Sequence, residues 1–292
     1  PTPSPVASAY PECGQKVKNV PGNYASIQAA INAAASGETV RVAAGTYSEN
    51  LNLKSGICLE GAGIDQTIIA RAGASGIRMW GVSNVIVKNF TVKGSGGPNY
   101  DGGGIQIGQS SNIRIESCRL TQNTATNGGG MSISSDSTNV SVSYCLIDNN
   151  KVSNGGGGIT AGDWWSPGIT LQYLTVANNA APATTGGTGG LRCDSMSPSI
   201  LSCVLVMNTG NGGGVGGAGG SALTGGYGGA GGAGGSGALE CNGGAAIVTS
   251  CSLGMNAGGP GGSGGPAGAT GPLGLGMPGD GRVQRPVHLS NP

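Results

Sequence analysis

The chain is poor in charged and aromatic residues. Only 9% of its 292 residues are Asp, Glu, Lys or Arg, only 4% are aromatic, and the formal net charge is +1. A charge this small gives no electrostatic attraction to phosphate groups, so nucleic acid is not expected as a partner. No apolar run approaches the roughly 20 residues that a membrane-spanning helix needs, so membrane insertion is not expected either.

The sequence also has few of the residues from which catalytic and metal sites are built. It contains one histidine, His288, and 13 acidic residues that are scattered along the chain. It has no paired short Cys or His spacings of the kind found in zinc sites, and no glycine-rich stretch ends in Lys-Ser or Lys-Thr. We therefore predict no catalytic residue, no metal and no cofactor.

The chain begins PTPSPVASAY, without a Met, which predicts a processed N-terminus from which a signal or pro-segment has been removed. The cysteines form an even set, and in a processed chain this favours an oxidising environment. We therefore expect a secreted protein, located outside the cell or at its surface. The eight cysteines are Cys13, Cys58, Cys118, Cys145, Cys193, Cys203, Cys241 and Cys251.

Similar segments recur along the chain at steps of about 28 residues, with one longer step before the last copy. Each copy ends in an asparagine, and the residue five positions before it is a cysteine in every copy but one. The copies are NIRIESCRLTQN (112–123), NVSVSYCLIDNN (139–150), GITLQYLTVANN (168–179), SILSCVLVMN (199–208) and AIVTSCSLGMN (246–256). The asparagines are Asn123, Asn150, Asn179, Asn208 and Asn256.

Within each copy the apolar residues alternate with polar ones, which indicates a short strand with one buried face. A strand this short cannot bury its face alone, but stacked copies make a continuous core. The repeat therefore predicts an all-β fold, a parallel β-helix of about eight coils. We expect the asparagines to form a ladder at sharp corners, because Asn tolerates a left-handed backbone.

The beginning of the chain predicts a helix over about 25–35 that caps the first coil, followed by strands near 40–42 and 51–53. With its motifs SIQAAINAA, GTYSENLNL and LEGAG, it resembles the right-handed parallel β-helix superfamily of pectate lyases, pectin methylesterases and many secreted repeat proteins. The sequence pattern at 189–208 is similar to that of secreted bacterial β-helix repeat proteins. The resemblance covers about residues 20–257 and implies a right-handed, single-stranded solenoid.

The enzymes of this superfamily use clustered or paired acids. The resemblance by itself does not identify such a set of acids in this chain. By repeat register, Glu116 is expected beside Lys88, and Asp148 beside Thr121, so neither column joins two acids. The downstream motifs of the esterases and polygalacturonases are missing. These observations favour a protein without catalytic activity, although a site formed across coils stays open.

The cysteine spacing leaves two pairings open. Cys193 and Cys203 have the same spacing as Cys241 and Cys251, so bridges could lie within each coil or join neighbouring coils. We favour bridges within each coil, because the spacing recurs as a unit. Cys118 and Cys145 share one column and could bridge or stack as thiols. Cys58 faces outward by register and is available to Cys13.

Two glycine-rich segments keep a frame of three residues. The insertion 213–236 is read as Gly-Gly-X triplets, and 259–276 has glycine at every third position. A period of three matches the polyproline II helix. We predict two polyproline II arms (213–221 and 225–236) and a third rod at 259–276, with a disordered linker as the alternative.

The sequence thus predicts an N-terminal extension (1–20), a β-helix (21–257) with a glycine-rich insertion (209–237), a polyproline II segment (258–281) and a tail (282–292). Our leading hypothesis is a structural protein, an extracellular filament or adhesive subunit that forms homo-oligomers through its terminal extensions. The alternative is a secreted protein that binds or cleaves carbohydrate, with a polysaccharide as partner. Its aromatic surface would contain Tyr144, Tyr173, Trp164 and Trp165.

Overall fold

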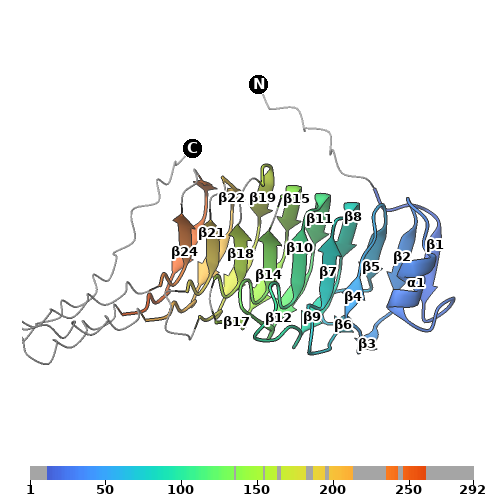
Figure 1. Ribbon diagram of the computed structural model, residues 1–292, viewed down its shortest axis with the longest axis horizontal. Coiled ribbons are helices and arrows are strands. Elements are labelled where there is room, and N and C mark those ends of the chain that lie inside the picture. The colour runs from blue at the N-terminus through green and yellow to red at the C-terminus, as the bar shows by residue number, and fades with distance from the viewer. Residues whose placement is uncertain are drawn as a thin grey trace, which may run out of the picture.

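The computed structural model describes residues 12–134, 136–153, 155–162, 166–181, 187–194, 197–212, 235–242 and 246–260. The described chain winds into a stack of coils, and each coil passes in turn through three parallel sheets, here called C, A and B (Figure 1). Helix α1 lies at one end of the stack and strand β24 at the other. This architecture confirms the predicted parallel β-helix.

The three sheets take one strand from successive coils. Sheet A contains, in order, β1 (Val17–Val20), β2 (Thr39–Val42), β5 (Cys58–Gly61), β8 (Ser83–Lys88), β11 (Ser111–Glu116), β15 (Thr138–Ser143), β19 (Ile169–Gln172), β22 (Ser199–Leu201) and β25 (Ile247–Thr249). Sheet B contains β3 (Gly45–Tyr47), β6 (Thr67–Ile69), β9 (Thr91–Lys93), β12 (Arg119–Thr121), β16 (Leu146–Asp148), β20 (Thr175–Ala177), β23 (Val204–Val206) and β26 (Ser252–Gly254).

Sheet C contains β4 (Leu51–Asn52), β7 (Ile77–Trp80), β10 (Ile105–Gly108), β14 (Met131–Ser134), β18 (Ile159–Gly162), β21 (Leu191–Asp194) and β24 (Leu239–Asn242). A further pair, β13 (Thr124–Ala125) and β17 (Lys151–Val152), follows sheet B in two of the coils. The strands are as short as the repeat predicts, so each is stable only because its neighbours in the stack pair with both of its edges.

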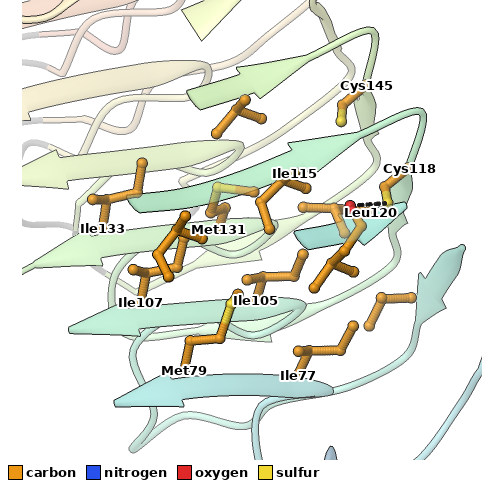
Figure 2. Close-up of a cluster of buried hydrophobic side chains, with 14 of the residues drawn as sticks. Ile77, Met79, Ile105, Ile107, Ile115, Cys118, Leu120, Met131, Ile133 and Cys145 are labelled. Carbon is orange, nitrogen blue, oxygen red and sulfur yellow. Dashed lines mark hydrogen bonds between the residues drawn. The ribbon is translucent and has the colours of Figure 1, made fainter. Parts of the chain in front are cut away.

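The interior of the stack is filled by columns of apolar side chains, one residue from each coil. On sheet C, Met79, Ile107 and Ile133 are in-register partners on neighbouring strands, and all three are fully buried. Figure 2 shows these columns beside Ile115 of sheet A and Leu120 of sheet B. The alternation in the sequence therefore marks the inward face correctly.

Helix α1 (Ile27–Ala33) covers the first coil, as predicted. The hydroxyl of Ser26 accepts a hydrogen bond from the Ala29 N–H at 3.2 Å. The carboxylate of Glu49, from the GTYSE segment, accepts from the N–H groups of Ile27 and Gln28 at 2.9 and 3.0 Å. Because the first N–H groups of a helix have no partner within it, these contacts fix where α1 begins.

From β8 onward, the chain turns from sheet A to sheet B through one residue with a left-handed backbone in each coil. These residues are Asn89, Ser117, Tyr144, Tyr173, Ser202 and Ser250, with φ between 48° and 64°. The residue after each of them belongs to one column along the stack. The members of this column, here called the corner column, are Phe90, Cys118, Cys145, Leu174, Cys203 and Cys251.

The asparagine ladder is present, but its physical basis differs from the prediction. The left-handed residue at this second corner is the one before each asparagine, for example Asn178 with a φ of 55°. The ladder asparagines instead use their side chains. Asn179 is fully buried, and its amide donates to the Ile147 carbonyl at 2.8 Å and to the Asn208 side chain at 3.0 Å. Each buried amide therefore joins three coils.

After the first coil, the chain returns from sheet B to sheet C through glycines, and in the later coils their backbones lie in contact. The Gly158 N–H donates to the Gly190 carbonyl at 2.9 Å. A β-carbon on Gly190 would lie 2.2 Å from the carbonyl oxygen of Ala238. Glycine is needed here because a side chain would push neighbouring coils apart.

The glycine-rich insertion begins and ends at this same corner. The Gly235 N–H donates to the Asn211 carbonyl at 2.7 Å, and the Gly259 N–H donates to the Gly235 carbonyl at 2.9 Å. The chain therefore leaves and re-enters the stack at one place. The predicted polyproline II arms and the third rod lie outside the described residues, apart from their ends, and so stay predictions.

Candidate functional site

Two of the predicted aromatic residues form a pair on the surface. The rings of Tyr144 and Tyr173 stack with centroids 4.9 Å apart and planes 11° from parallel, as predicted. Their side chains are outside the stack, and they are 58% and 49% exposed. The neighbouring coils carry only Ser117 and Ser202 at this corner, so no third ring extends the pair. Trp164 and Trp165 lie outside the described residues.

A second aromatic side chain, which the sequence analysis did not single out, lies on the outer face of sheet C. The six-membered ring of Trp80 packs over Gly108, where a β-carbon would lie 2.4 Å from a ring carbon. The Arg78 guanidinium is 5.0 Å from the ring centroid, and its Nε donates to Gln106 at 3.1 Å. Trp80 is still 37% exposed, so part of the indole is open to solvent.

The outer face of sheet C beyond Trp80 carries small residues. The last residues of the next three strands are, in order, Gly108, Ser134 and Gly162. Residues this small cannot stand out from the strands, so they leave a low strip between Trp80 and the last coils. No salt bridge joins Arg78 to an acidic residue within the described ranges.

A polar cluster forms the other end of this strip. The Asn242 amide donates to Asp194 at 3.0 Å and to Glu240 at 3.1 Å, so both carboxylates lie within reach of one nitrogen. Arg192 forms a salt bridge with Asp194 at 2.8 Å, and the Thr188 hydroxyl donates to Glu240. The expectation that the acids stay scattered is wrong here. We call Trp80, the small residues and this cluster the sheet C strip.

A second pair of acids meets on sheet B through one arginine. Arg119 binds both oxygens of Asp148, each at 3.0 Å, and also Asp65 at 3.2 Å. Hydrogen bonds to Asp148 raise the pKa of Arg119 above its usual value. Because one guanidinium occupies both carboxylates, this cluster ties successive coils together and leaves no free acid and base pair.

The described residues contain neither a cluster suited to a metal ion nor a helix suited to a membrane. In those ranges, no three His, Cys, Asp or Glu side chains gather where they could hold a metal ion. Of the helical structure described, nothing has both the length and the apolar character for crossing a bilayer.

Comparison with known proteins identifies the family. The model of the right-handed β-helix region matches residues 29–253, and the chain belongs to this family. No curated protein matches the chain. A solved structure, the A-module of the Azotobacter vinelandii mannuronan C-5 epimerase AlgE6, is 19% identical with a TM-score of 0.46. The alignment covers 77% of this chain and 64% of that one.

The A-module of the Azotobacter vinelandii mannuronan C-5 epimerase AlgE4 is 18% identical with a TM-score of 0.29, and the alignment covers 66% of this chain and 75% of that one. Both likenesses concern the β-helix fold alone, and this chain spans 64% of the length of the AlgE6 module. Any function has to be argued from the residues of the present chain.

Proposed function

We propose that the protein is secreted and binds a polysaccharide along the sheet C strip. The observation that carries this proposal is Trp80, packed over Gly108 beside an arginine that has no acidic partner in the described chain. An indole offers a large apolar face, and Arg78 and Gln106 offer hydrogen-bonding groups next to it. This is the combination that a sugar ring with one apolar face and several hydroxyl groups requires.

The geometry of the strip supports a chain rather than a single sugar. Successive strands of a sheet are about 4.8 Å apart, which is close to the length of one sugar unit in an extended polysaccharide. A chain placed along the strip would meet Trp80 at one end, Ser134 in the middle and the Asn242 amide at the other. Because Arg78 lacks an acidic partner, a carboxylate-bearing sugar fits best beside Trp80.

The test is affinity electrophoresis of Trp80→Ala in gels containing alginate, polygalacturonate or a neutral glucan. We expect the uronate gels to retard the wild-type protein and the variant to migrate as in a gel without polysaccharide. The physical reason is that removing the indole takes away the largest apolar contact of the strip.

The matched control is Tyr144→Asn, because asparagine tolerates the left-handed backbone at that corner. It removes one ring of the Tyr144–Tyr173 pair and leaves the sheet C strip unchanged. Retardation lost in Tyr144→Asn but kept in Trp80→Ala would move the binding surface to the tyrosine corner and overturn the proposal.

A second candidate function is the end-to-end assembly expected from the sequence. The observation that favours it is the last described coil, which has no helix comparable to α1 over it within the described ranges. Leu253 faces inward there yet is exposed, and Met255 is 77% exposed. We propose that this end contacts another copy. Sedimentation velocity should then detect species larger than the monomer, and monomer alone at every concentration would contradict it.

A further inference from the structure

The cysteines of the described chain occur as neighbours in the stack. Cys13 and Cys58 form a disulfide with their Cα atoms 5.3 Å apart. This confirms the prediction that Cys58 is available to pair with Cys13. The other six are thiols in the structure: Cys118, Cys145, Cys193, Cys203, Cys241 and Cys251. The bridges predicted within each coil are wrong for this structure, because the ten-residue spacing carries the chain from sheet C past sheet A to the far corner.

Cys193 and Cys241 are direct partners in register on the neighbouring strands β21 and β24. Both occupy the inward column of sheet C that begins with Met79. In-register residues on neighbouring strands are about 4.8 Å apart, which lies inside the range of Cα separations found in disulfides. Cys193 is buried, whereas Cys241 is exposed because it belongs to the last described coil.

The other four thiols belong to the corner column, where Leu174 separates them into two pairs. Figure 2 shows Cys118 and Cys145 on successive coils at this corner. Cys203 and Cys251 are also in contact, since the Cys203 N–H donates to the Cys251 sulfur at 3.3 Å. Because Leu174 stands between Cys145 and Cys203, each cysteine of the column has only one cysteine neighbour.

We propose that the oxidised protein carries three disulfides that join neighbouring coils, Cys118–Cys145, Cys193–Cys241 and Cys203–Cys251. Together with Cys13–Cys58, these bonds pair all eight cysteines of the chain. Two of the three bonds connect the coils on either side of the glycine-rich insertion. They attach the last described coil to the stack at sheet C and at the corner column. The chain between these two coils is the longest, because it contains the insertion.

Each bond forms by exchange with a disulfide oxidant such as oxidised glutathione. A thiolate of the pair attacks the oxidant, one glutathione thiolate leaves, and the second cysteine displaces the other glutathione from the mixed disulfide. The two protein thiols lose two electrons and two protons, and one oxidised glutathione becomes two reduced molecules.

The order of reaction follows from the environment of each sulfur. The hydrogen bond from Cys193 lowers the pKa of Cys241, and Cys241 is the exposed member, so its thiolate attacks first. The hydrogen bond to Cys241 and burial both raise the pKa of Cys193. Burial raises the pKa of Cys203 to about 11, and contact with Cys118 together with burial raises that of Cys145. Cys118 and Cys145 are both buried, so an oxidant reaches this pair only during folding, before its coils are packed.

The test is peptide mapping of the full chain after folding in a glutathione redox buffer. The protein is denatured without reductant, alkylated with N-ethylmaleimide and digested, and the linked peptides are identified by mass spectrometry. We expect no alkylated cysteine and the three proposed links. Six alkylated cysteines, or links joining Cys193 to Cys203 and Cys241 to Cys251, would overturn the proposal.

The variant Cys241→Ser gives an independent test. Cys193 should become the only alkylated cysteine, while the links Cys118–Cys145 and Cys203–Cys251 remain. A Cys193–Cys203 link in this variant would contradict the pairing. If the variant fails to fold, the links found in the wild-type protein alone test the three proposed disulfides.

Discussion

Replacing Asn179 with alanine should lower the free energy of unfolding by about 3–5 kcal/mol. The Asn179 amide is fully buried and accepts from the Asn150 N–H at 2.9 Å and from the Asn150 side chain at 3.0 Å. It also donates to Ile147 and Asn208. Alanine removes all four hydrogen bonds and leaves the Asn150 N–H without an acceptor in the interior, where one unpaired group costs about 1–3 kcal/mol.

The matched control for this prediction is Asn256→Ala, at the last rung of the ladder. Asn256 donates to Leu205 at 2.8 Å and accepts from Asn208, but it is only partly buried. Water can reach the groups that its removal leaves unpaired, so the loss should be about 1–2 kcal/mol. Urea unfolding followed by circular dichroism measures both variants. Equal losses at Asn179 and Asn256 would mean that burial of the ladder does not set its contribution.

Replacing Gly190 with alanine should destabilise the protein by about 2–3 kcal/mol through overpacking. The added β-carbon would lie 2.2 Å from the Ala238 carbonyl oxygen and 3.3 Å from the Asn208 side-chain nitrogen. The backbone cannot give way there without lengthening the hydrogen bond from Gly190 N–H to Gly237, now 2.9 Å. The coils on either side of the insertion should therefore separate first.

Gly254→Ala provides the comparison for this effect. Gly254 is also a glycine of a late coil, but a β-carbon there would meet nothing within 4 Å. The free energy of unfolding of Gly254→Ala should stay within about 0.5 kcal/mol of the wild-type value. Thermal unfolding of the two variants side by side is sufficient, and a Gly190→Ala midpoint equal to that of Gly254→Ala would refute the close approach of the coils.

The fold could be predicted from the sequence because its repeat is a physical unit. In a stack of coils, the period of the sequence places residues beside one another, so columns can be read directly. Glu116 is paired with Lys88 and Asp148 with Thr121, both as predicted from register. The helix and the Cys13–Cys58 pairing followed from the amphipathic pattern and from the outward position of Cys58.

The features that were not predicted depend on side-chain geometry and on the longer step before the last copy of the repeat. The ladder asparagines act through buried amides, which a preference for left-handed backbone does not reveal. The Asp194–Glu240 cluster was missed because the insertion hides the period, although the repeated Cys193 and Cys241 already align Arg192 with Glu240. The packing of Trp80 over Gly108 could also have been predicted from the repeat, since the two residues occupy the same position in neighbouring coils.

Isothermal titration calorimetry measures directly whether the sheet C strip binds polysaccharide. A uronate oligosaccharide taken from the polysaccharide that retards the wild-type protein is titrated into wild type, Trp80→Ala and Tyr144→Asn. We expect wild type and Tyr144→Asn to bind with similar affinity, and Trp80→Ala to bind at least about tenfold more weakly, a loss of about 1.4 kcal/mol or more. Equal affinity for wild type and Trp80→Ala would contradict it.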